Sequence, residues 1–274
     1  MADQLDPHDH LETEPATLPQ PGDAGSIAVR RAAVITAAVG IAHAVLLLAA
    51  FWLVRSKTPS ADASDAELIA FYGDSENRRR LVVAGLYLIP FSGIAFLWFV
   101  VALRMWISGS TRRINILLAN VQLAAGIVYV ALIIAAGASF SLLAATYDLG
   151  DNSVSPVLER EFPRLGTLLF LTLAMRMAAM VVFTTSSIGR STGILPRWFV
   201  AIGIAVGIAL LLSASLNPLL VLVFPMWLIA LSIILLLRAR EIPKDAVLPP
   251  PAARDVRGSM LRRVATPDTD APPH

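Results

Sequence analysis

The chain has 274 residues, of which 56% are hydrophobic and 15% are charged, and its mean hydropathy is +0.69. This composition excludes an ordinary soluble domain and is typical of a membrane protein with several spans. The formal net charge is +2, and the 22 basic residues form no stripe with interleaved aromatics, so we expect no nucleic-acid partner. The chain has no cysteine, which excludes disulfides and thiol chemistry, and we expect neither a metal nor another cofactor.

The two ends of the chain lack the pattern of a folded segment. Residues 1–29 hold acids, prolines and glycines without a periodic apolar face and predict a disordered acidic tail. We interpret His8 and His10 within it as solvated residues and not as a metal site. Residues 239–274 are rich in proline and arginine and predict a second disordered tail. Residues 30–238, between the tails, predict one transmembrane domain.

Six apolar runs fill this central region. A bilayer core is about 30 Å thick, so a helical span needs roughly 20 residues, and each run is close to that length. The predicted fold is all-α, a polytopic membrane protein built as a six-transmembrane-helix bundle. Pro90 should bend the second span, because proline cannot donate the helical hydrogen bond. The predicted spans are residues 32–54, 81–103, 114–138, 165–188, 199–216 and 218–237.

The loop after the first span contains a helix start signal. Ser64, followed by Glu67 three residues later, matches a capping box and predicts a short helix on the membrane surface. Leu68, Phe71 and Tyr72 on this helix should face lipid or the neighbouring spans.

Residues 139–164 are predicted to form the longest loop between spans. Within it, Ser155 is a plausible cap and Pro156 suits the first helical position. We therefore expect a helix that runs up to or through Pro163 into the fourth span.

Basic residues outside the spans predict the orientation. With a cytoplasmic amino terminus, 14 of the 22 basic residues lie in inner segments and 7 in outer segments. Because inner loops carry the excess of Lys and Arg, we expect both termini in the cytoplasm and the protein in the plasma or inner membrane of a cell.

Three stretches of the chain resemble a group of known sequences. They are GILPRWFVAIG at residues 193–203, FPMWLIALS at residues 224–232 and the AELIAFY loop after the first span. They are similar to uncharacterised six-span membrane proteins of actinobacteria, over roughly residues 30–238. The resemblance implies a bacterial six-helix membrane protein, and it implies no activity, substrate or catalytic residue.

Common signatures of catalysis are missing from the sequence. It has no Walker A loop, no G-x-G-x-x-G after a strand, no H-E-x-x-H and no G-x-S-x-G. The predicted spans also contain no Asp or Glu, whereas ion-coupled transporters typically place a carboxylate within the membrane. These absences favour a protein that is not an enzyme.

Four polar residues lie near the middle of predicted spans: His43, Gln122, Tyr129 and Arg176. An arginine facing lipid at that depth would cost at least about 3 kcal/mol, so Arg176 should point into the bundle. Gln122 and Tyr129 are seven residues apart and so should share one face of the third span. Tyr129 and Arg176 lie at comparable depth and could meet. One hypothesis is that these four residues line a cavity around Arg176 for a small anionic or lipidic ligand. The alternative is that Arg176 ties helices together through neutral acceptors.

The other noteworthy residues have simpler interpretations. Gly203 and Gly207, at small-xxx-small spacing, predict close helix contact. Arg190, Arg197 and Trp198 predict an interfacial anchor that contacts anionic lipid.

Three classes of function stay open from the sequence. The favoured class is a non-enzymatic protein that acts through helix or partner interactions or as a scaffold. Its candidate partners are the lipid bilayer, anionic lipid and other membrane proteins. The second class is a binder or carrier of the ligand around Arg176, which a water-accessible pocket at that residue would favour. The third is an intramembrane enzyme that uses His43, which a hydroxyl or acid within its reach would favour.

Overall fold

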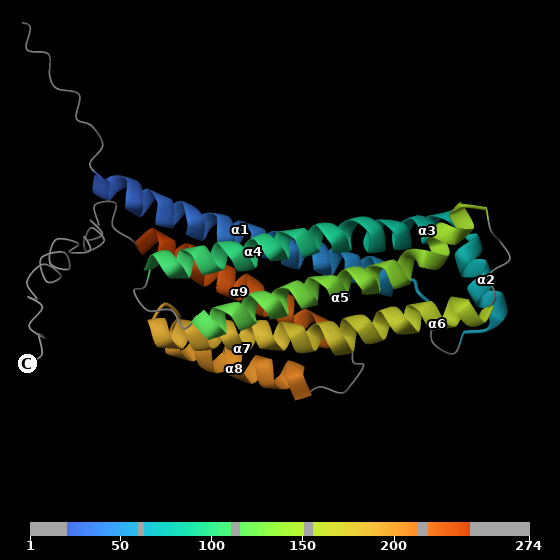
Figure 1. Cartoon of the computed structure of the whole chain (residues 1–274). Helices are drawn as coiled ribbons and strands as arrows, with labels where there is room; N and C mark the ends of the chain where they lie inside the picture. Colours follow the sequence, from blue (N-terminus) through green and yellow to red (C-terminus); the bar gives the residue numbers. More distant parts are fainter. Residues whose placement is uncertain (1–20, 60–62, 111–115, 151–155, 213–218, 242–274) are drawn as a thin grey trace, which may run out of the picture. The chain divides into compact units, whose positions relative to one another are not determined.

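The computed structural model describes residues 21–59, 63–110, 116–150, 156–212 and 219–241 (Figure 1). Regular structure in these residues is entirely helical, which confirms the predicted all-α class. Residues 28–242 form one compact unit, described here by itself. The disorder predicted for residues 1–20 and for most of residues 239–274 falls outside the described residues.

Five helical stretches of the described chain are long and apolar enough to cross a membrane. Two of them contain a π-helical turn, so each carries more than one label. The stretches are α1 (Pro21–Arg55); α3 (Ser75–Val82), η1 (Val83–Leu88) and α4 (Ile89–Ser110); α5 (Ile116–Asp148); α6 (Pro156–Thr167), η2 (Leu168–Ala174) and α7 (Met175–Thr192); and α9 (Leu220–Glu241).

The fifth predicted span coincides with α8 (Arg197–Leu212), an apolar helix of 16 residues. At 1.5 Å per residue it is about 24 Å long, which is shorter than a typical hydrocarbon core. The last part of this predicted span, residues 213–216, lies outside the described residues. The described residues therefore contain five helices that are long and apolar enough to span a membrane and one shorter apolar helix.

Two predicted boundaries are corrected by the structure. Helix α1 begins at Pro21, so residues 21–29 are helical and not part of a tail without structure. Likewise, residues 139–164 are mostly helix and not a loop, because α5 continues to Asp148 and α6 begins at Pro156. Adding a residue to an existing helix costs far less free energy than starting a new helix. A helix that begins in an apolar span therefore readily continues past the end of the apolar run.

The prediction of a helix through Pro163 is confirmed, since α6, η2 and α7 form one continuous helical stretch. The expected cap, Ser155, lies outside the described residues. The π-helical turn η1 ends two residues before Pro90, where a bend was expected. Proline lacks an N–H group, and a wider turn is one way in which a helix accommodates the missing bond.

The short helix α2 (Asp65–Gly73) has the predicted capping box. The Glu67 amide donates to Ser64 Oγ at 3.3 Å, and the Ser64 amide donates to Glu67 Oε2 at 2.8 Å. Its apolar face, Leu68, Phe71 and Tyr72, is buried. Phe71 and Tyr72 pack with residues of α3 and α5, so this face is turned toward protein and not toward lipid.

Two arginines fix α2 to the long helices. Arg78 donates to Asp148 at 2.7 Å and to the carbonyl oxygens of Tyr72 and Gly73 at 2.7 and 2.8 Å. At the other end of α2, Arg160 donates to Asp65 at 2.5 Å and to the Ala63 carbonyl at 2.9 Å. Exposed ion pairs contribute little alone. Here each guanidinium also satisfies backbone carbonyls, which holds α2 over the ends of α5 and α6.

Helix α5 is the centre of the described fold and contacts α3, η1, α4, α6, η2 and α7 (Figure 1). It approaches η1 closely at Gly137, where an added Cβ would lie 2.7 Å from the carbonyl oxygen of Gly85. The predicted glycine contact in α8 is also present. A Cβ at Gly207 would lie 3.0 Å from the Phe183 ring, and Gly203 is in close contact with Ser186 of α7. These glycines serve packing.

Candidate functional site

His43, Ser92 and Tyr129 form a polar cluster in the interior of the helix bundle, and all three are fully buried. They come from α1, α4 and α5. The imidazole Nδ1 of His43 lies 2.9 Å from the Ser92 carbonyl oxygen and 2.8 Å from Ser92 Oγ. Its Nε2 lies 3.3 Å from the Tyr129 hydroxyl.

The partners of this cluster define its protonation. A carbonyl oxygen can only accept, so we infer that His43 Nδ1 carries a proton and donates to Ser92. Nε2 is then an acceptor, and the Tyr129 hydroxyl donates to it. The Ser92 hydroxyl donates to the His43 carbonyl at 3.2 Å. Every polar side-chain group of the cluster is therefore satisfied by protein, as expected for a structural network in a core.

Hydroxyls within reach of His43 are the feature that would favour an intramembrane enzyme. A substrate must also reach them, however, and none of the three residues lines either of the two cavities described below. Phe96 and Phe224 pack against the imidazole, with ring centroids 4.7 and 6.1 Å away. The geometry therefore favours a structural role in core packing for His43 over a catalytic role.

Gln122 forms a separate pair. Its amide donates to Thr185 Oγ1 of α7 at 2.6 Å, and both side chains are buried. Gln122 and Tyr129 do share the inward face of α5, as the seven-residue spacing predicts. They are about 10 Å apart along the helix and have different partners.

Arg176 belongs to neither polar group. It is half-buried and donates from Nη1 to the Thr172 carbonyl, one turn back in its own helical stretch, at 3.4 Å. It lines neither described cavity. The structure thus brings His43 and Tyr129 together and leaves Gln122 and Arg176 apart from them, which gives no support to a four-residue site around Arg176.

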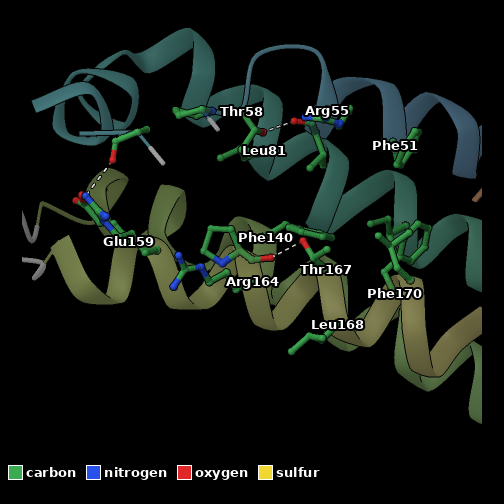
Figure 2. Close-up of a pocket in the computed structure, with 18 of the residues that line it drawn as sticks. Phe51, Arg55, Thr58, Leu81, Phe140, Glu159, Arg164, Thr167, Leu168 and Phe170 are labelled. Carbon is green, nitrogen blue, oxygen red and sulfur yellow. Dashed lines mark hydrogen bonds between the residues drawn. The ribbon is translucent and has the colours of Figure 1, made fainter. Parts of the chain in front are cut away.

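A cavity of about 660 Å³ is lined mainly by α1, α2, α6 and η2, with single residues of α3, α4 and α5 (Figure 2). We call it the amphipathic cavity, because one part of its wall is apolar and another is polar. The apolar wall includes Leu47, Ala50, Phe51, Val54, Ile89, Phe140, Leu168, Phe170 and Leu171. The polar wall includes Arg55, Thr58, Tyr72, Glu159, Arg160, Arg164 and Thr167.

The three arginines of this cavity differ in their partners. Arg160 is paired with Asp65, and Arg164 donates to Glu161 at 2.7 Å. Arg55 is exposed at the end of α1 and has no hydrogen-bond or ion-pair partner among the described residues. Its guanidinium is therefore available to a bound anion.

Glu159 of α6 is an unusual wall residue because only 1% of it is exposed. Its Oε1 accepts from the Tyr147 hydroxyl at 2.6 Å, whereas its buried Oε2 has no donor among the described residues. The ring of Tyr72, also in the wall, stacks on Tyr147 with centroids 6.0 Å apart. Burial, and next the charge of Glu159, raise the pKa of Tyr72 well above its usual value, so this tyrosine stays neutral.

A second groove, of about 790 Å³, lies where α7 ends and α8 begins. Arg190 and Arg197, two of the predicted interfacial residues, line it together with Arg238 of α9. Trp198 is 60% exposed beside Arg197. Since α6 to α7 is one helical stretch, this arginine groove and the amphipathic cavity lie at opposite ends of that stretch.

Sequence reasoning did not identify the residues of the amphipathic cavity. It placed Arg55, Glu159 and Arg160 in loops, where charges are normally solvated. The segment from Pro156 to Pro163 carries no local signal of this burial, since its apolar residues Val157 and Leu158 are exposed and its charged Glu159 is buried. The burial of Glu159 depends on contacts with distant segments, which the sequence did not reveal.

Comparisons with known proteins give no further guide to the site. No protein family, no curated protein and no solved structure matches the chain. The resemblance to six-span membrane proteins of actinobacteria accordingly stays a prediction.

Proposed function

We propose that this chain is a six-span, non-enzymatic protein of the plasma or inner membrane that binds a phospholipid-like amphiphile in the amphipathic cavity. The observation that carries the proposal is the unpartnered guanidinium of Arg55 at the edge of an apolar cavity of about 660 Å³. Sites for small ligands commonly have volumes of about 300 to 1,000 Å³, are mostly apolar and hold a few polar groups.

The two parts of the cavity suit the two parts of such a ligand. Phe51, Phe140 and Phe170 offer apolar surface to an acyl chain, which gains about 0.8 kcal/mol for each buried CH₂. Arg55 offers the planar donor fork that phosphate groups prefer. Figure 2 shows Arg55 on α1 and Phe170 farther along the opposite wall, so a ligand with separate charged and apolar ends fits both.

This proposal selects the second class left open by the sequence, a binder of a lipidic ligand, and moves its site away from Arg176. A scaffold role without a ligand is the alternative, and it is the outcome if no lipid binds.

Orientation is a separate part of the proposal. The ion pairs Arg78–Asp148 and Arg160–Asp65 bring the first and third loops to one end, and Arg238 joins Arg190 and Arg197 at the other. This arrangement supports an even number of spans. Together with the bias of basic residues, it supports cytoplasmic termini and an amphipathic cavity at the outer side. Reporter fusions after Gly150 and after Ser259 should therefore be active on opposite sides of the membrane. Reporters that are both active on the same side would contradict this topology.

The binding proposal is tested by phosphatidylglycerol and phosphatidylethanolamine, each added to the purified protein in detergent. A ligand that binds only the folded state raises the unfolding temperature. We expect such a rise, and we expect Arg55→Gln to weaken the apparent affinity about tenfold, because it removes a charge-assisted contact. Arg79→Gln is the matched control, since Arg79 is an exposed arginine of the neighbouring α3 that does not line the cavity. No lipid-dependent rise in the parent protein would refute the proposal.

A further inference from the structure

Glu159 needs a hydrogen-bond donor for its buried carboxylate, and the proposed binding of an amphiphile does not by itself supply one. Its carboxylate is almost completely buried, and Oε2 has no donor among the described residues. A buried carboxylate oxygen left without a donor costs several kcal/mol, so such atoms normally have a partner. The two basic residues that follow it in α6, Arg160 and Arg164, are paired with Asp65 and Glu161 and not with Glu159.

A ligand that enters the cavity can provide the missing donor once the Glu159 carboxylate turns toward it, because Oε2 itself is buried. Glu159 is part of the cavity wall, and so is the ring of Tyr72. A cation near this corner would meet a carboxylate and an aromatic face, two groups that both attract positive charge. Because Oε2 lacks a hydrogen bond, the cation that fits best carries N–H groups, as a primary ammonium does. A quaternary ammonium has the charge without the donor.

We propose that the ligand of the amphipathic cavity is an aminophospholipid, with its ammonium group at Glu159, its phosphate at Arg55 and its acyl chain along the phenylalanines. This inference rests on the proposed lipid-binding function and specifies the class of lipid. Figure 2 shows Glu159 and Phe170 at opposite ends of the view, on α6 and η2. They are 11 residues apart, or about 16 Å along the helical stretch, which separates the polar end of the ligand from the apolar end.

The apolar wall favours a lipid over a soluble amine of the same headgroup. A free phosphoethanolamine would meet Glu159 and Arg55 but would leave the surface of Phe51, Phe140 and Phe170 uncovered. A lipid covers that surface as well and should bind far more tightly.

The test is native mass spectrometry of the full chain with an equimolar mixture of phosphatidylethanolamine, phosphatidylcholine and phosphatidylglycerol that carry identical acyl chains. The first two differ only in three methyl groups on the nitrogen. We expect the parent protein to retain the ethanolamine lipid about tenfold more than the choline lipid, as one charge-assisted hydrogen bond allows. Glu159→Gln keeps the shape of the side chain and should reduce this preference to less than about threefold.

The control is Glu76→Gln in α3, because Glu76 is exposed and both it and its partner Arg80 lie outside the cavity wall. It should keep the preference. Equal retention of the ethanolamine and choline lipids by the parent protein would overturn the inference while leaving the proposed function intact. Retention of none of the three lipids would overturn both. If soluble O-phosphoethanolamine alone raised the unfolding temperature as much as the lipid does, the ligand would be a soluble compound and not a lipid.

Discussion

Two polar regions of this protein differ in how their groups are satisfied. In the central cluster, His43, Ser92 and Tyr129 find partners in one another and in backbone carbonyls, and they line neither of the two described cavities. In the amphipathic cavity, the described part of the chain offers no partner to Arg55 and a donor to only one of the two oxygens of Glu159. A closed network stabilises the fold, whereas an incomplete one beside an empty volume is suited to a ligand. The position of a polar residue near the middle of a predicted span therefore does not by itself identify it as a functional residue.

The largest expected effect on stability is at His43. Replacing it with alanine creates a cavity and leaves the hydroxyl of Tyr129 and the carbonyl of Ser92 without their partner. We expect a loss of about 3 kcal/mol in the free energy of unfolding, measured in detergent, with unchanged lipid retention by the folded fraction. Loss of lipid retention at full stability would instead assign His43 to a binding site.

Tyr129→Phe should have a smaller effect, because it keeps the ring that packs on Phe96 and Phe224 and removes only the hydroxyl. His43 Nε2 then lacks its donor. We expect a loss of about 1 to 2 kcal/mol in the free energy of unfolding, again with lipid retention unchanged. An unchanged free energy of unfolding would show that the 3.3 Å contact contributes nothing.

Arg78→Gln tests how α2 is held over the cavity. The substitution removes contacts with Asp148 and with the carbonyls of Tyr72 and Gly73. We expect a global loss of less than about 1 kcal/mol and faster amide hydrogen exchange confined to Asp65–Gly73, because exposed pairs mainly affect local opening. Exchange in α2 that is equally fast in the parent protein would mean that α2 is not docked in solution.

The smallest effect is expected at Arg176, the residue that the sequence singles out most clearly. Its only described hydrogen bond is a long one to Thr172 in its own helical stretch. Arg176→Leu should change the free energy of unfolding by less than about 0.5 kcal/mol and should leave lipid retention intact. A clear loss of retained lipid would restore Arg176 as a ligand-binding residue.

Local patterns in the sequence predicted the parts of the fold that depend on a few neighbouring residues. The capping box of Ser64 and Glu67 and the continuation of a helix through Pro163 are examples. The shared face of Gln122 and Tyr129 also followed from spacing alone. Each of these features is determined within one helix.

The binding residues could not be predicted in the same way, because contacts between distant segments create the cavity. Glu159 of α6 accepts a hydrogen bond from Tyr147 of α5, and Arg160 joins α6 to Asp65 of α2, 95 residues away. Arg55, Ala63 and Phe140 likewise line the same cavity from α1, from the segment before α2 and from α5. A polar residue in a presumed loop carries no signal of such burial in its own neighbourhood.

The most direct test of the account compares two neighbouring alanines of α1. Ala50 is buried and lines the amphipathic cavity, whereas Ala49 is exposed on another side of the same helix. Ala50→Phe should fill part of the cavity and Ala49→Phe should not, although both add the same side chain. Native mass spectrometry of the proteins extracted with their lipids is expected to show one bound phospholipid fewer for folded Ala50→Phe than for Ala49→Phe and the parent protein. Equal lipid content in all three would contradict the account.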